Sequence, residues 1–211
     1  MTITIHTLPV GQLETNCYIA IDEKTRQALI IDPGDSAEYI TNILSDNSAI
    51  PLQILATHGH FDHILAVTAL QLAYNIPFFM HHADEFLLKR MRESAKHFLG
   101  VDTDPAPMVF EHMPSRIKLG ESFFTVIKTP GHTPGSVCFY LEEEKILLSG
   151  DTIFADGGVG RTDFSYSTHG ELVSSIEKLL QLPDETHIYP GHGKQSTIGG
   201  ERQLHDRRAV Q

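Results

Sequence analysis

Residues 56–64 read A-T-H-G-H-F-D-H-I and follow directly on the apolar run at 52–56. An apolar run that leads into a glycine-containing segment predicts a strand ending in a tight loop. Imidazole and carboxylate ligands together suit Zn, Fe or Mn. Residues two apart share a face in an extended segment, so we expect the first two histidines of this loop to bind one ion together. The side chains of the loop that can bind metal are His58, His60, Asp62 and His63.

Asp62 and His63 would then point toward a second ion. The alternative to a metal site is a cluster of polar loop residues whose side chains hydrogen-bond to the backbone. That is the usual interpretation of a lone histidine. Four ligand-type residues between positions 58 and 63 favour a metal site instead.

Three later apolar runs end in the same way, each followed by a glycine and a ligand-type residue. They lead into Gly131-His132, Gly150-Asp151 and Gly191-His192. A glycine there allows the backbone to fold close beside a crowded site, where a Cβ would obstruct it. The repeated order of strand, tight turn and ligand predicts that all three ligand-type residues join the first loop around the metal.

Length, composition and charge limit the number of domains, the partners and the location that we expect for the protein. The chain has 211 residues, of which 41% are hydrophobic and 20% charged, so we expect a single domain spanning 1–211. A formal net charge of −11 disfavours nucleic acid as a partner. The first residues alternate as a strand does, so we expect no signal peptide, and no apolar run reaches membrane-spanning length; we therefore expect a cytoplasmic protein without a membrane partner. Cys17 and Cys138 lie in apolar runs and are interpreted as small core residues.

The patterns also predict the secondary structure. We expect a helix that has Asp35 or Ser36 as its cap and ends near Asn47, and a capping box at 168–171 that starts another helix. The irregular stretch at 100–115 is interpreted as a mobile flap beside the site. Asp32 has two interpretations, a partner that holds a ligand histidine or a turn former. Other expected strands are 2–7, 16–21, 27–31, 78–80, 117–128, 136–141 and 145–148, and other expected helices are 64–74 and 83–98.

Taken together, the motifs resemble those of the metallo-β-lactamase fold superfamily. They are THGHFDH at 57–63, PGHTPG at 130–135, GDTIF at 150–154 and PGHG at 190–193. Within the superfamily the chain is most similar to short glyoxalase II-like (hydroxyacylglutathione hydrolase-like) hydrolases, over about residues 2–203. The resemblance implies an α/β fold, a four-layer αββα sandwich with the site at one edge of its two sheets.

The resemblance also implies the ligand sets and the chemistry. His58, His60 and His132 would bind one divalent metal, Asp62, His63 and His192 the other, and Asp151 would bridge them. The metals are expected to be zinc, with iron or manganese as alternatives. The implied reaction is hydrolysis of a small thioester such as S-D-lactoylglutathione by metal-bound hydroxide, which Asp62 would orient. We expect a monomer or small homo-oligomer.

The sequence departs from that of the full-length glutathione thioesterases in the region that binds the thiol part of the substrate. Full-length glutathione thioesterases have a C-terminal helical region that helps to bind glutathione, whereas 19 residues follow His192 here (211 − 192). The thiol part is therefore expected to be held differently. Arg161 stands where the thioesterases have a basic residue, so it is a candidate anchor for a substrate carboxylate. Alternatively, it pairs with Asp163 or Asp156 and braces the loop.

Two other functions stay open. The run at 160–164, G-R-T-D-F, also resembles persulfide dioxygenases, which use one iron held by the equivalents of His58, His132 and Asp151. The complete second ligand set and PGHG at 190–193 favour the hydrolase. A non-catalytic metal-binding domain is the third hypothesis, and the seven intact ligand-type residues argue against it.

Overall fold

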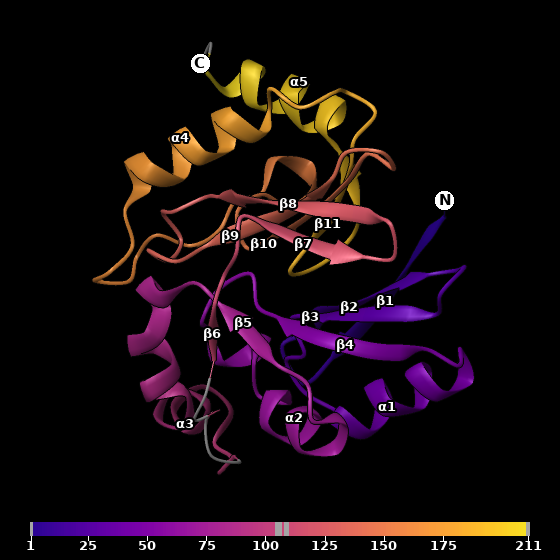
Figure 1. Cartoon of the computed structure of the whole chain (residues 1–211). Helices are drawn as coiled ribbons and strands as arrows, with labels where there is room; N and C mark the ends of the chain where they lie inside the picture. The colour runs from indigo at the N-terminus through magenta and orange to yellow at the C-terminus, as the bar shows by residue number, and fades with distance from the viewer. Residues whose placement is uncertain (1, 104–106, 108–109, 210–211) are drawn as a thin grey trace.

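Two mixed six-stranded sheets pack face to face in the computed structural model, and helices cover their outer faces (Figure 1). The structure describes residues 2–103, 107 and 110–209. The predicted four-layer αββα sandwich is thereby confirmed.

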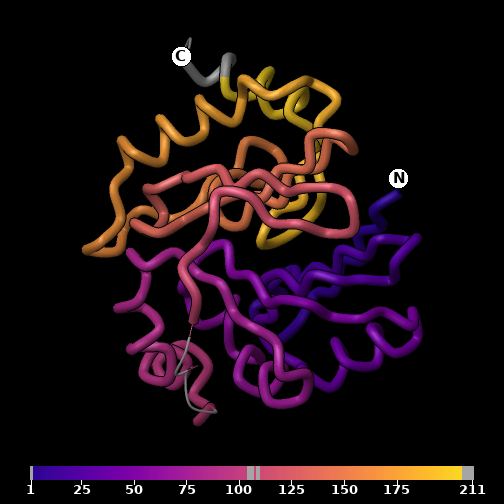
Figure 2. The backbone as a smooth tube through the Cα atoms, viewed as in Figure 1, coloured from indigo at the N-terminus to yellow at the C-terminus, as the bar shows by residue number. Residues whose placement is uncertain are grey.

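The first half of the chain builds one sheet and the helices below it in the view of Figure 2. The first three strands pair antiparallel, whereas the next three follow in parallel. A parallel pair needs a crossover connection, and the three helices of this half provide these crossovers. The elements are β1 (Ile3–Val10), β2 (Thr15–Asp22), β3 (Gln27–Ile31), α1 (Ala37–Asp46), β4 (Ile50–Leu55), α2 (Val67–Tyr74), β5 (Phe78–Met80), α3 (Glu85–Leu99) and β6 (Glu111–His112).

The second half builds the other sheet, in the order β12-β11-β10-β9-β8-β7. Only β10 and β11 are parallel neighbours, and α4 connects them. The helices of this half cover the sheet on the side away from the first sheet (Figure 1). The elements are β7 (Arg116–Leu119), β8 (Ser122–Lys128), β9 (Val137–Leu141), β10 (Ile146–Gly150), α4 (His169–Leu179), β11 (His187–Pro190), β12 (Ser196–Thr197) and α5 (Ile198–Ala209).

Apolar side chains fill the three spaces between the four layers. Tyr18, Phe124 and Phe139 pack between the two sheets. Cys17 lies in the layer between the first sheet and its helices, and Cys138 between the second sheet and its helices. Both cysteines are free and fully buried, so their interpretation as small core residues is confirmed. Central strands such as β2 are buried along their whole length because both faces of each sheet are covered.

Backbone hydrogen bonds between loops join the two sheets at one edge of the sandwich. The N–H of Val137 donates to the carbonyl of Thr57 at 2.8 Å, and the N–H of Asn16 donates to the carbonyl of Gly191 at 2.7 Å. The N–H of Gly191 donates in turn to the carbonyl of Gly150 at 2.8 Å. These bonds tie the loop after β4 to the start of β9, and the residue after β11 to the end of β10 and to β2.

Three sequence predictions need correction. The single strand expected at 117–128 is wrong, because Gly120 adopts a left-handed conformation (φ 60°) and turns the chain into the β7–β8 hairpin. The capping box at 168–171 is also wrong: α4 begins as expected, but the Thr168 side chain makes no capping hydrogen bond. The helix expected at 64–74 begins at Val67, after a 3-10 turn at Phe61–His63.

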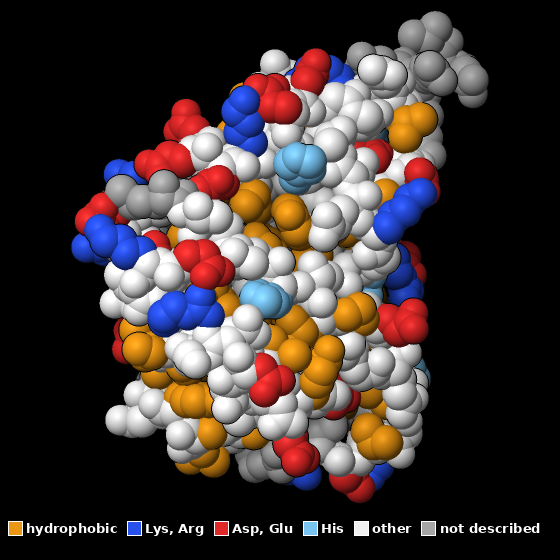
Figure 3. Space-filling model, turned by 90° about the vertical axis from the view of Figure 1, so that its right-hand side faces the viewer, with side chains coloured by type: hydrophobic (Ala, Val, Ile, Leu, Met, Phe, Trp, Pro, Cys, Tyr) orange, Lys and Arg blue, Asp and Glu red, His pale blue; other side chains and the backbone are white. Residues whose placement is uncertain are grey.

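The flap expected at 100–115 is described only in part. Its residues 104–106 and 108–109 lie outside the described residues, and its end forms β6, which pairs with β5. No helix in the described ranges is long and apolar enough to cross a membrane. On the face shown in Figure 3, acidic and basic side chains are interspersed, with apolar side chains exposed between them.

The packing between the sheets yields a stability prediction. We expect Phe139→Ala to lower the free energy of unfolding by about 3–5 kcal/mol, because it leaves a cavity where a fully buried aromatic ring fills the inter-sheet core. Urea denaturation measures the change. Phe123→Ala is the matched control, because this ring is 38% exposed and its loss should change stability far less. Equal losses in both variants would contradict the assignment of the core.

Candidate metal centre

The loop after β4 brings two imidazole rings together with one from the second half of the chain. The Nδ1 atom of His60 lies 3.0 Å from Nε2 of His58 and 3.0 Å from Nε2 of His132. These three nitrogens form a group that could hold a metal ion. His58 and His60 thus share a site, as their spacing predicted. His58 presents its Nε2 atom to this site, whereas His60 presents its Nδ1 atom.

A second group lies next to the first and consists of Asp62, His63 and His192. Oδ2 of Asp62 is 3.3 Å from Nε2 of His192 and 3.7 Å from Nε2 of His63. The 3-10 turn at Phe61–His63 carries Asp62 and His63, and the ring centroid of His63 lies 4.2 Å from that of His58. Asp62 faces a different point from His58 and His60, as expected, whereas His63 also belongs to a group with His58 and Asp151.

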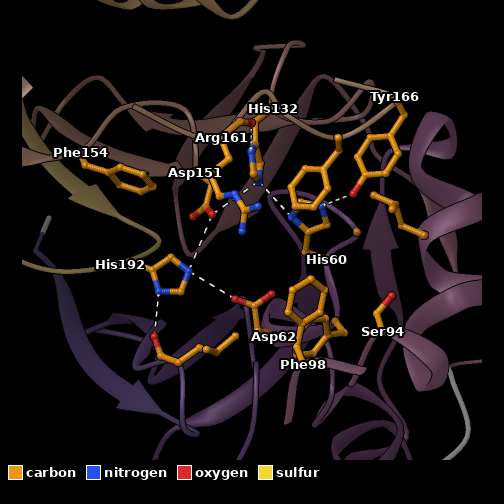
Figure 4. Close-up of a pocket in the computed structure, with 15 residues that line it drawn as sticks. His60, Asp62, Ser94, Phe98, His132, Asp151, Phe154, Arg161, Tyr166 and His192 are labelled. Carbon is orange, nitrogen blue, oxygen red and sulfur yellow. Dashed lines mark hydrogen bonds and ion pairs between the residues drawn. The ribbon is translucent and has the colours of Figure 1, made fainter. Parts of the chain in front are cut away.

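Asp151 lies between the two groups. Figure 4 shows it between His132 and His192. Its Oδ2 is 3.5 Å from Nε2 of His132 and 3.7 Å from Nε2 of His192, while its Oδ1 is 3.5 Å from Nε2 of His63. Gly191 packs so closely here that a Cβ would stand 2.2 Å from Oδ1 of Asp151. One carboxylate therefore reaches both groups, and the glycine makes room for it.

Hydrogen bonds hold the outer ring nitrogens of the histidines, meaning the nitrogens that point away from the centre of the site. The rings of His58 and His63 are held in this way near the end of β3. Nδ1 of His63 donates to Oδ2 of Asp32 at 3.0 Å. The Thr57 hydroxyl donates to the same carboxylate at 2.7 Å and lies 3.0 Å from Nδ1 of His58, from which its oxygen accepts. Of the two interpretations of Asp32, the structure shows the partner of a site histidine.

Two further rings are held by backbone carbonyl groups. The carbonyl of Arg161 accepts from Nδ1 of His132 at 2.8 Å, and the carbonyl of Leu13 accepts from Nδ1 of His192 at 3.1 Å. A carbonyl oxygen can only accept, so Nδ1 carries the proton in both rings. The inner Nε2 of each ring is the atom that faces the other ligand-type residues of the site.

Tyr166 holds the fifth ring, and the sequence analysis did not identify it. Its Oη lies 2.8 Å from Nε2 of His60. The tyrosine ring stacks on Phe164 with centroids 5.2 Å apart and an interplanar angle of 7°. Burial raises the pKa of Tyr166 to about 12, so the phenol stays protonated. No local pattern marks this residue, because its loop approaches His60 only in the folded chain.

The charges of the site favour a cation. Burial, and then the neighbouring His132, lower the pKa of His60 to about 3, so its ring is neutral and has a lone pair to offer. Burial opposes charge on His63 as well, but Asp151 and Asp62 outweigh it and raise the pKa of His63 to about 10. A positive charge is therefore stabilised between these two carboxylates.

Two buried atoms at the centre provide a direct test of whether the residues fit a metal. Nε2 of His63 and Oδ1 of Asp151 are buried without a hydrogen-bond partner among the described residues. Burying unpaired polar atoms is unfavourable, and both are ligand atoms for a divalent metal. A metal ion at this position would satisfy both, so the site fits the cofactor that the sequence predicts.

Asp84 connects two of the loops and was also missed by the sequence analysis. The side chain is fully buried just before α3. It accepts from the N–H of Gly59 at 2.9 Å, the hydroxyl of Thr133 at 2.7 Å and the N–H of Gly135 at 2.7 Å. Since Gly59 separates His58 from His60 and Thr133 follows His132, this carboxylate fixes the spacing of the first group.

Arg161 lies at the cavity beside the site but is paired with an acid. Its Nε and Nη2 donate to Asp163 at 2.9 and 2.7 Å, and its guanidinium group lies 4.8 Å above the ring of Phe164. The interpretation that it pairs with Asp163 and braces the loop is therefore what the structure shows. Its role as an anchor for a substrate carboxylate stays a prediction.

Sequence comparison relates the chain to a known family and to named relatives. Residues 10–192 match the family model described as the metallo-beta-lactamase superfamily. The chain is 34% identical to the probable metallo-hydrolase YqgX of Bacillus subtilis, over 90% of each chain. It is also 34% identical to the hydroxyacylglutathione hydrolase GloC of Haemophilus influenzae, over 95% of each chain.

Solved structures show the same fold. The BLEG-1 B3 metallo-beta-lactamase superposes with a TM-score of 0.86 at 35% identity, covering 95% of this chain and 97% of that one. TTHA1623, solved in a di-iron-bound form, gives 0.86 at 34% identity, covering 94% and 98%. ETHE1 from Myxococcus xanthus gives 0.78 at 27% identity, covering 99% and 85%.

The position of Asp84 leads to a prediction about metal affinity. Asp84→Asn keeps the size of the side chain, but its amide nitrogen cannot accept hydrogen bonds, so at least one loop loses its support. We expect the affinity for the more weakly held metal ion to fall by about 10–100-fold, the usual effect of losing a partner of a metal ligand. Competition with a chelator measures it. Asp102→Asn is the control, because Asp102 is exposed and, among the described residues, pairs with Lys96. An unchanged affinity in folded Asp84→Asn would contradict the positioning role.

Proposed function

Because the chain belongs to the metallo-β-lactamase superfamily, we propose that it is a dinuclear metal-dependent hydrolase of small thioesters such as S-D-lactoylglutathione. One observation carries this proposal: five histidines have their outer nitrogens held by hydrogen bonds, while their inner nitrogens converge around two carboxylates. This is the arrangement of a metal centre rather than of a polar surface cluster. The curated name of the Haemophilus relative supports the choice of thioester.

The seven residues divide into two ligand sets that share a carboxylate. We propose that Asp151 contributes to both, since its two oxygens approach different histidines. Zinc is the proposed metal, and iron is the alternative that the di-iron relative favours. The proposed sets are His58, His60 and His132 for one ion, and Asp62, His63 and His192 for the other.

The metals would supply the Lewis acid, since bound divalent cations polarise a carbonyl group and lower the pKa of water to about 7. The chain would supply orientation. Asp62 lines the cavity and accepts from the Thr15 hydroxyl at 3.2 Å, so this carboxylate is fixed where it can hold the proton of an attacking water. A thiolate leaves readily, so the reaction does not require an additional general acid.

The proposal also covers the class of substrate, the cellular location and the oligomeric state. A net charge of −11 supports a small-molecule substrate rather than nucleic acid. We also propose a cytoplasmic location and a monomer or small homo-oligomer.

The bridging position of Asp151 provides the test of this function. We expect Asp151→Ala to lose bound metal and to reduce thioester hydrolysis by more than about 100-fold, because both ligand sets lose an oxygen. Metal content by elemental analysis and turnover of S-D-lactoylglutathione are measured on the same samples. Asp46→Ala, an exposed acid at the end of α1, is the control and should keep both properties. Full turnover by metal-depleted Asp151→Ala would rule out the proposal.

A persulfide dioxygenase is the second candidate. The run G-R-T-D-F at 160–164 and the structural similarity to ETHE1 favour it. The intact group of Asp62, His63 and His192 favours the hydrolase, because a single iron would leave it without a role. Oxygen uptake on glutathione persulfide that depends on one iron per chain would select the dioxygenase. Metal binding without turnover of any thioester, lactone or phosphoester would select a non-catalytic domain.

A further inference from the structure

The cavity beside the metal centre has a largely apolar wall. Its volume is about 430 Å³, which is in the range that holds a small-molecule ligand. Figure 4 shows Phe98 beside Asp62, and Phe154 on the side of His192. Apolar side chains therefore border the reactive end of the cavity. The apolar lining residues are Leu13, Phe61, Leu87, Phe98, Phe154 and Phe164.

Two of these side chains are exposed although they are large and apolar. Phe98 is 53% exposed and Leu13 is 43% exposed. The Phe98 ring nevertheless has a fixed support, because it stacks on the buried ring of Phe61 with centroids 5.8 Å apart and an interplanar angle of 14°. An apolar surface held in place at the mouth of a cavity gains stability when a ligand covers it.

The charged groups of the cavity do not favour an anionic ligand. Among the described lining residues, Arg161 is the one Lys or Arg side chain, and Asp163 already binds it through two hydrogen bonds. Asp62 and Asp151 at the reactive end are proposed metal ligands, so their charge is offset in the metal-loaded protein and they provide no cationic partner for a substrate. A carboxylate on the substrate would have to compete with Asp163 for the guanidinium group. The two carboxylates of a glutathione thioester therefore find no unpaired Lys or Arg in this wall.

We infer that the preferred substrate is a thioester with an apolar aliphatic or aromatic group attached to its acyl or its thiol side, and that this group packs against Phe98, Phe61 and Leu13. The inference rests on the thioesterase function proposed above and narrows its substrate class. The reaction itself is ordinary hydrolysis: the oxygen of water bonds to the acyl carbon and the C–S bond breaks. One proton of water ends on the thiol, and the other is released as the acid ionises.

Two series of neutral thioesters test the inference on the metal-loaded protein. In the first series, the acyl group of N-acetylcysteamine thioesters lengthens from acetyl to hexanoyl. In the second series, the acyl group stays acetyl and the alkyl chain of the thiol lengthens from two to six carbons. We expect kcat/KM to rise by about fourfold per methylene in at least one series, the usual effect of burying a methylene group. S-D-lactoylglutathione serves as the charged reference substrate.

A pair of variants shows whether the gain comes from this wall. We expect Phe98→Ala to reduce the ratio of kcat/KM between the longest and shortest substrates by about tenfold. Phe123→Ala removes an exposed ring from β8, which does not line the cavity, and should keep the ratio. Circular dichroism checks that both variants are folded. An unchanged ratio in folded Phe98→Ala would overturn the placement of the apolar group.

The outcomes separate the two proposals. Hydrolysis that is independent of chain length in both series, or that is far faster for S-D-lactoylglutathione, would overturn the inference and leave the thioesterase function standing. Failure to hydrolyse any thioester would overturn both. A rise with chain length that Phe98→Ala weakens would support both.

Discussion

The site depends on the hydrogen bonds that fix the outer nitrogens of its histidines. An imidazole ring can rotate, and a ring with a free outer nitrogen could turn its lone pair away from the centre. Asp32, Thr57, Tyr166 and two backbone carbonyls each prevent this for one ring. Because these partners lie in four separate segments of the chain, the fold as a whole is needed to aim the rings at one place.

Neither half of the chain contains a complete site. The first half carries the loop with His58, His60, Asp62 and His63, and the second half carries the remaining ligand-type residues. The backbone bond from Val137 to Thr57 joins the two halves next to the first imidazole. The packing of one sheet on the other therefore brings the site together, which gives the αββα architecture a role in chemistry as well as in stability.

Much of this arrangement could be predicted from local patterns. The ligand-type residues each follow an apolar run and a tight turn, so their convergence was predictable before the fold was known. Asp84 and Tyr166 could not be found in that way, because each acts on a loop far from it in the sequence. The β7–β8 hairpin was missed for a different reason: the apolar pattern is interrupted only at residues 120–122, and the left-handed backbone at Gly120 makes this short break a turn.

Helix α3 links the substrate cavity mechanically to the first group of histidines. Leu87, Ser94 and Phe98 on α3 line the cavity, and Asp84 at its beginning holds the loops of the metal centre. A molecule that shifts this helix on entering the cavity must also strain the bonds of Asp84. Occupancy of the cavity and affinity for metal are then thermodynamically coupled, and the coupling has the same size in both directions.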